Sequence, residues 1–125
     1  MIKTIILVGL GGAIGSILRY LSGWFASKYF QGSFPISTLV INIFGSLLIG
    51  VFIGILAKYY PENHPLKFLL IIGFCGGFTT FSSFAVENYN LFQNGNQFSA
   101  YIYIITSVIL TISAVGIGNY ITKFI

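Results

Sequence analysis

Four long apolar runs, each of about 21 or 22 residues, take up most of the 125-residue chain. As α-helices they would each be about 32 Å long, close to the hydrocarbon thickness of a bilayer. Only 6% of the residues are charged, against roughly 25% in a soluble domain, so a soluble fold of this size could not cover its surface. The sequence therefore predicts one all-α membrane domain over residues 1–125, with four transmembrane helices per subunit near residues 5–25, 36–57, 66–86 and 100–121.

The connections between these runs are short and polar, and they contain turn residues. Pro35 and Pro65 stand just before the second and third runs, where a helix tolerates proline because the missing N–H would be unpaired there. The first run has the outline of a signal peptide, but it continues to residue 25 and leads into further spans. We therefore expect it to stay in place as the first helix of a multi-pass protein.

Several function classes are excluded by composition. The net charge of +4 is spread over isolated cations, which gives no sign of a nucleic-acid partner. One cysteine excludes an intrachain disulfide, and one histidine with two glutamates cannot form a zinc or di-iron site. The glycine-rich segment 9–15 imitates a dinucleotide-binding turn but lacks the acidic residue expected about 20 positions later. With no catalytic dyad either, we expect the chain not to be an enzyme.

The basic residues are distributed unevenly between the two sides of the membrane. In a four-span chain the two termini and the second connection share one side, and that side carries four of the six Lys and Arg residues. For a single orientation, this modest excess favours a cytoplasmic N-terminus. The count does not distinguish one orientation from two.

Small residues recur at i, i+4 spacing in three of the four runs. The sets are Gly11 with Gly15, Gly12 with Ser16, Ser46 with Gly50 and Gly54, and Ala114 with Gly118. Such stripes let helix backbones approach closely in lipid. We therefore expect the four helices to pack tightly with one another and with further copies of the chain.

Polar side chains inside a span are costly unless they face protein or a water-filled path. Asn42 lies within the second run, with Thr38 one turn before it and Ser46 one turn after it. Asn42 can bond a neighbouring helix or line such a path, and the sequence leaves both interpretations open. Tyr103 begins a row of hydroxyls on the fourth run, where hydroxyls can also bond the carbonyls of their own helix.

The third run contains the stretch Gly-Phe-Cys-Gly-Gly-Phe-Thr-Thr-Phe-Ser-Ser-Phe at residues 73–84. Two glycines followed by two β-branched threonines form a poor helix, which predicts a broken helix between Gly76 and Thr80. A break at mid-membrane must be buried in protein or line a cavity, and its free carbonyls suit a cation such as sodium. Phe81 and Phe84 share one face, so their electropositive ring edges could attract an anion. Lipid contact or core packing is the alternative for these two rings.

This stretch closely resembles the signature of the Fluc (CrcB-like) fluoride channels of bacterial membranes. Residues 11–20, Gly-Gly-Ala-Ile-Gly-Ser-Ile-Leu-Arg-Tyr, and residues 38–46, Thr-Leu-Val-Ile-Asn-Ile-Phe-Gly-Ser, resemble the first two helices of that family. The resemblance covers essentially the whole chain, with Ser83 where threonine is expected. It implies a fluoride-selective passive ion channel that exports cytoplasmic fluoride across the bacterial inner membrane.

The resemblance further implies an antiparallel, dual-topology homodimer with two fluoride pores at the subunit interface and a central structural sodium ion. Carried over position by position, it assigns the pore side chains to Asn42, Phe81, Phe84, Ser82, Ser83 and Tyr103. It places Arg19 and Glu87 toward a vestibule, with interfacial anchoring as the alternative for Arg19. The backbone carbonyls of Gly76 and Thr79 from both subunits would hold the sodium ion.

Two other classes of function stay open. A small four-helix, dual-topology antiporter would share the number of spans, but such antiporters couple protons through a glutamate in the first helix. Here Glu62 and Glu87 lie outside a span or at its end. A membrane-packing subunit would explain the small-residue stripes but not the Gly-Gly/Thr-Thr stretch.

Overall fold

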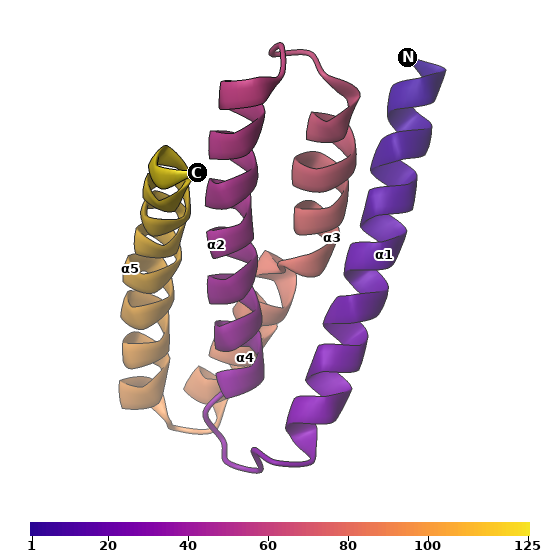
Figure 1. Ribbon diagram of the computed structural model, residues 1–125. Helices are drawn as coiled ribbons and strands as arrows, with labels where there is room; N and C mark the ends of the chain where they lie inside the picture. The colour runs from indigo at the N-terminus through magenta and orange to yellow at the C-terminus, as the bar shows by residue number, and fades with distance from the viewer.

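The computed structural model describes all 125 residues and consists of helices joined by short connections (Figure 1). Four helical segments are long and apolar enough to cross a membrane, namely Ile2–Ser27, Ile36–Tyr59, Lys67–Gln93 and Gln97–Phe124. The prediction of an all-α chain with four spans is therefore confirmed. Each span is longer than the apolar run that predicted it, because interfacial polar residues continue the helices at their ends.

The first, second and fourth spans are continuous helices. They are α1 (Ile2–Ser27), α2 (Ile36–Tyr59) and α5 (Gln97–Ile121), and α5 ends in a short 3₁₀ turn, η2 (Thr122–Phe124). α2 begins directly after Pro35, as the sequence predicts.

The third span is built from three pieces. A π-helical segment, η1 (Lys67–Cys75), leads into a single helical turn, α3 (Gly76–Phe78). After two extended residues the chain continues as helix α4 (Phe81–Gln93). The third span is therefore the one whose local geometry differs from that of a simple transmembrane helix.

The helices form two packed pairs (Figure 1). α1 lies along η1 and α3, α2 lies along α5, and α1 and α2 contact each other far less. α4 passes behind the lower part of α2 in this view and contacts α5. Both termini and the connection 60–66 lie toward one end of the bundle, and the connections 28–35 and 94–96 lie at the other end.

Glycines make the close approaches between helices. An added Cβ at Gly15 would collide with the carbonyl oxygen of Phe74 in η1, and one at Gly50 in α2 would collide with that of Val115 in α5. Gly118 on α5 meets the backbone of α2 in the same way. The predicted tight packing is thus present, and these small residues are used between helices of one subunit.

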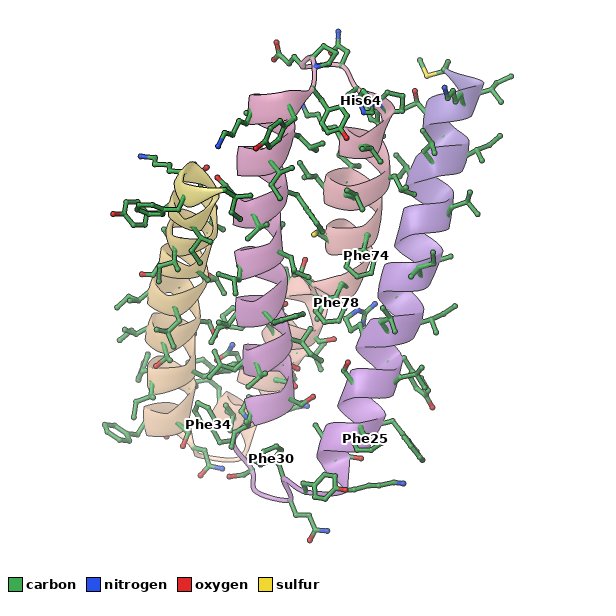
Figure 2. The ribbon with its side chains drawn as sticks, viewed as in Figure 1. Phe25, Phe30, Phe34, His64, Phe74 and Phe78 are labelled. Carbon is green, nitrogen blue, oxygen red and sulfur yellow. The ribbon has the colours of Figure 1, made fainter.

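The surface of the subunit is largely apolar. Only 18 of the 125 residues are buried, and most large hydrophobic side chains are exposed. Lipid or further protein must cover such a surface, since water would not. One compact cluster is formed by Leu91, Ala100 and Tyr103, with Phe34, Leu39 and Phe84 packed against it. Between α1 and α2, Phe74 and Phe78 stack with ring centroids 5.9 Å apart (Figure 2).

Candidate functional site

The third span is interrupted at two threonines. Thr79 (φ −82°, ψ 158°) and Thr80 (φ −148°, ψ 125°) have extended backbone between α3 and α4. We expected the helix to be lost from the glycines onward, but Gly76 and Gly77 are helical. Gly77 lies against the backbone of Gly12 on α1, so its missing side chain serves close packing. The extended conformation falls on the β-branched residues, which favour it.

Asn42 of α2 holds both backbone groups of Thr80. Its Nδ2 donates to the Thr80 carbonyl oxygen at 3.0 Å, and its Oδ1 accepts from the Thr80 N–H at 2.8 Å. The interhelical hydrogen bond that the sequence left open is therefore present. An amide nitrogen carries two hydrogens, and only one of these is used here, so Asn42 keeps a donor for a ligand.

Two of the carbonyls beside the interruption, those of Gly76 and Thr79, lose their helical donors to side-chain acceptors. In a continuous helix the N–H of Thr80 would donate to the carbonyl of Gly76, but it donates to Asn42 instead. The N–H of Ser83 would donate to the carbonyl of Thr79, but it donates to Thr80 Oγ1 at 3.1 Å and so caps α4. Carbonyl oxygens without such partners can bind a hard cation, so the residues present fit the sodium site that the resemblance implies.

Arg19 reaches from α1 to the same interruption. Its Nε donates to the carbonyl oxygen of Gly77 at 3.0 Å. Arg19 also lines a hollow of about 290 Å³ together with Thr38, Thr80 and Ser83. Its side chain is therefore directed at the middle of the third span and supplies the donor that the Gly77 carbonyl requires.

A groove of about 250 Å³ lies along the interruption. The side chains that line it are Asn42, Ser46, Ile49, Thr79, Thr80, Phe81, Phe84, Ser107, Val108 and Thr111. The ring centroids of Phe81 and Phe84 are 5.3 Å apart, and Phe81 is 79% exposed. The structure therefore brings Asn42 and both phenylalanines, 39 to 42 positions apart in sequence, to one open groove.

Glu87 lies at the centre of a side-chain network. One of its carboxylate oxygens accepts from Thr38 Oγ1 at 2.8 Å, and the other accepts from Tyr103 Oη at 2.9 Å. Tyr103 is fully buried against Phe84 and lines none of these hollows. Its hydroxyl is used in the hydrogen bond to Glu87. Glu87 itself lines a hollow of about 350 Å³ shared with four other residues. These are Thr38, Ser82, Ser83 and Val86.

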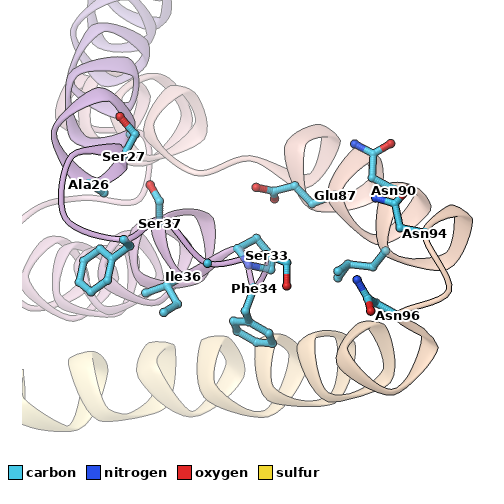
Figure 3. A pocket seen from close by; sticks show the side chains of 15 residues that line it. Ala26, Ser27, Ser33, Phe34, Ile36, Ser37, Glu87, Asn90, Asn94 and Asn96 are labelled. Atoms are coloured by element: carbon cyan, nitrogen blue, oxygen red, sulfur yellow. The ribbon is translucent and has the colours of Figure 1, made fainter.

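The largest of these hollows, of about 390 Å³, is lined by residues of the connections 28–35 and 94–96, which lie at the end of the bundle opposite the termini (Figure 1). Glu87 and Asn90 line it from α4, Asn94 lines it from the residue that caps α4, and Asn96 lines it from the turn before α5 (Figure 3). Sequence reasoning missed these asparagines and also Thr38 as a partner of Glu87. A signal existed, since residues 87, 90 and 94 recur at i, i+3, i+7 and so share one helix face.

Residues 6–119 match the protein family described as "CrcB-like protein, Camphor Resistance (CrcB)". The chain belongs to this CrcB-like family. Several curated relatives bear the name "Fluoride-specific ion channel FluC". The one from Flavobacterium psychrophilum is 48% identical over 97% of this chain and 98% of its own length. Those from Azobacteroides pseudotrichonymphae (40% identical; 99% of each chain) and Ruminiclostridium cellulolyticum (39%; 97% and 93%) match similarly.

The match places this CrcB-like chain among multi-pass membrane proteins, in agreement with its four apolar spans. It also includes every candidate residue of the site, from Arg19 in α1 to Tyr103 in α5. The resemblance seen in the sequence is thereby confirmed at the level of the family.

Proposed function

We propose that this CrcB-like chain is the subunit of a fluoride-selective channel through which cytoplasmic fluoride leaves a bacterial cell across the inner membrane. The observation that carries the proposal is the 48% identity, over nearly the whole of both chains, to a relative named as a fluoride-specific ion channel. The polar hollows that adjoin one another along the third span support it, because an ion needs a hydrated or polar path through a bilayer.

The donors along these hollows suit a small, strongly hydrated anion. Fluoride can leave water only where other donors replace its hydration shell. The spare Nδ2 hydrogen of Asn42, the hydroxyls of Ser82 and Ser83, and the ring edges of Phe81 and Phe84 are all donors of this kind. None of these groups is a fixed cation, so the ion would be bound weakly enough to leave again.

A second copy of the chain, in antiparallel orientation, would complete the path. Within one subunit the groove at Asn42 is open and the ring of Phe81 is mostly exposed. A facing copy would enclose the groove and shield Phe81. By two-fold symmetry the dimer would contain two such pores, and Tyr103 would support each of them through Glu87 and Phe84.

A sodium ion would stabilise this dimer. The carbonyls of Gly76 and Thr79 lack their helical partners, and one pair from each subunit would supply four oxygen ligands. Four neutral oxygens suit a monovalent hard cation better than calcium or magnesium, which recruit charged ligands and usually more of them. The ion would hold the two interruptions together and would not be transported.

Ion efflux from liposomes tests the proposal. Purified protein is reconstituted in liposomes loaded with potassium fluoride or potassium chloride, and efflux is started with a potassium ionophore. We expect fast fluoride loss with chloride retained, and neither loss from protein-free liposomes. Proton-coupled uptake of a cation with no fluoride current would instead establish the antiporter, and chloride loss as fast as fluoride loss would contradict selectivity.

A further inference from the structure

The hydrogen bonds between Asn42 and Thr80 do more than join two helices. We propose that Asn42 is the positioning residue that creates the cation site, because it keeps the N–H of Thr80 away from the carbonyl of Gly76. This inference rests on the proposed function, in which that carbonyl binds sodium. It adds a role for Asn42 that is separate from any contact with fluoride.

The bonding around the interruption is selective. The carbonyl of Gly77 accepts from Arg19 Nε, and the carbonyl of Thr80 accepts from Asn42 Nδ2. Side chains from α1 and α2 thus satisfy two of the carbonyls exposed by the interruption. The carbonyls of Gly76 and Thr79 are among those left without their helical donors, and for Gly76 that donor is bound by Asn42 of the neighbouring helix α2.

The carbonyls of Gly76 and Thr79 are each free because a side-chain acceptor binds the N–H that would otherwise donate to them. Asn42 Oδ1 takes the N–H of Thr80, which frees Gly76. Thr80 Oγ1 takes the N–H of Ser83, which frees Thr79. Removing either acceptor would let the N–H return to its helical carbonyl, because a buried N–H without a partner is costly. The carbonyl would then be occupied by an intrahelical bond and would compete poorly for a cation.

The position of α2 makes this arrangement specific. An added Cβ at Gly45, three residues after Asn42, would collide with the side chain of Thr79. α2 therefore lies directly against the interruption, and the short side chain of Asn42 reaches both backbone groups of Thr80. A residue of the same volume without an acceptor would fill this space but would leave the N–H of Thr80 free to bond Gly76.

The test is a sodium titration of subunit association in liposomes. Donor and acceptor dyes are attached at an exposed Asn63→Cys, and energy transfer is followed as sodium chloride replaces N-methyl-D-glucamine chloride at constant ionic strength. Asn42→Asp keeps the acceptor, whereas Asn42→Leu removes it and keeps the same branching at Cγ. Thr80→Ser and Thr80→Val form the matching pair for the second carbonyl. Ser46→Ala is the control, since Ser46 lines the same groove but its side chain makes no hydrogen bond.

We expect Asn42→Leu and Thr80→Val each to raise the half-saturating sodium concentration at least tenfold, equivalent to about 1.4 kcal/mol. For Asn42→Asp, Thr80→Ser and Ser46→Ala, the half-saturating sodium concentration should be no more than about twice that of the wild type. A role in packing alone would lower the extent of association at every sodium concentration without shifting the midpoint. Should Asn42→Leu fail to fold, the Thr80 pair gives the same comparison.

Two outcomes overturn the inference, and they are distinguishable. In the first outcome, association of the wild type depends on sodium, and Asn42→Leu and Thr80→Val have the same half-saturating sodium concentration as the wild type. The positioning role is then wrong and the sodium site stands. If association of the wild type does not depend on sodium, the sodium site of the proposed function is wrong and the positioning role fails with it.

Discussion

Arg19 illustrates how one side chain can stabilise an interrupted membrane helix. Its Nε donates to the carbonyl of Gly77, which lies in the turn just before the extended residues. In hydrocarbon an unpaired carbonyl is costly, so a donor from the adjacent helix compensates for the local loss of helical bonding. The guanidinium group of Arg19 is also partly buried beside polar groups rather than exposed to lipid tails.

We predict that Arg19→Met destabilises the protein by about 1–3 kcal/mol, because it leaves the carbonyl of Gly77 without its donor. Thermal loss of dimer in detergent, measured by size-exclusion chromatography after heating, reports the change. Lys3→Met is the matched control, since Lys3 is exposed and makes no hydrogen bond. Equal melting temperatures for the two variants would mean that the bond to Gly77 contributes nothing measurable.

The two phenylalanines of the groove can be tested by a change that keeps their bulk. Replacing Phe81 or Phe84 with Ile removes the electropositive ring edge but leaves an apolar group of similar reach. Phe81 is 79% exposed in the subunit, so Phe81→Ile should change subunit folding little. We predict that fluoride efflux falls by roughly tenfold or more, as expected when about 1.4 kcal/mol of ion stabilisation is lost. If fluoride efflux and dimer yield were both unchanged in the two variants, the rings of Phe81 and Phe84 would serve only in packing.

At the scale of elements, glycines set the distances between helices. α1 approaches η1 and α3 at Gly11 and Gly15, where a Cβ would meet backbone atoms. Backbone atoms cannot move aside as the end of a flexible side chain can. A methyl group at such a position must therefore push the two helix backbones apart at that contact.

We predict that Gly15→Ala destabilises the subunit by about 1–3 kcal/mol through overpacking. Gly9→Ala in the same helix is the control, because nothing lies within 4 Å of the added Cβ. Gly9→Ala should be neutral or stabilising by up to about 1 kcal/mol, since alanine favours the helix. The comparison uses retention of the folded dimer after heating in detergent. Similar losses in both variants would contradict the packing role of Gly15.

At the scale of the whole molecule, the subunit has an apolar surface and only a weak charge bias. The end of the bundle with both termini carries four of the six Lys and Arg residues. Such a modest excess gives little preference for one orientation. An antiparallel dimer requires both orientations in the same membrane, and a chain with a weak bias can supply them.

We predict dual insertion, which can be measured with two uncharged surface positions at opposite ends of the bundle. Gln31→Cys and Asn63→Cys are made separately in a Cys75→Ala background, so the charge bias is unchanged. A membrane-impermeant thiol reagent applied to intact cells should label roughly half of the copies at each position. Complete labelling at one position and none at the other would contradict the antiparallel dimer.

The sequence by itself determined the four spans and the region of the site. Hydropathy is a local property and the bilayer fixes the length of a span, so four apolar runs were sufficient to predict four helices. The residues of the site were also recognisable, because Asn42 and the stretch 73–84 place polar groups where lipid does not tolerate them. The position of the interruption was predicted less well, since glycines break a helix in isolation but serve close packing in this bundle.

Only the tertiary structure decided which groups pair with one another. Asn42 bonds Thr80, which is 38 positions away, and Arg19 bonds Gly77, which is 58 positions away. Glu87 accepts hydrogen bonds from hydroxyl groups on two other helices. Each of these partners is brought near by the lateral packing of helices, and that packing depends on which glycines meet which backbones. A hydropathy pattern carries no information on lateral contacts, whereas the close packing of the folded bundle determines them.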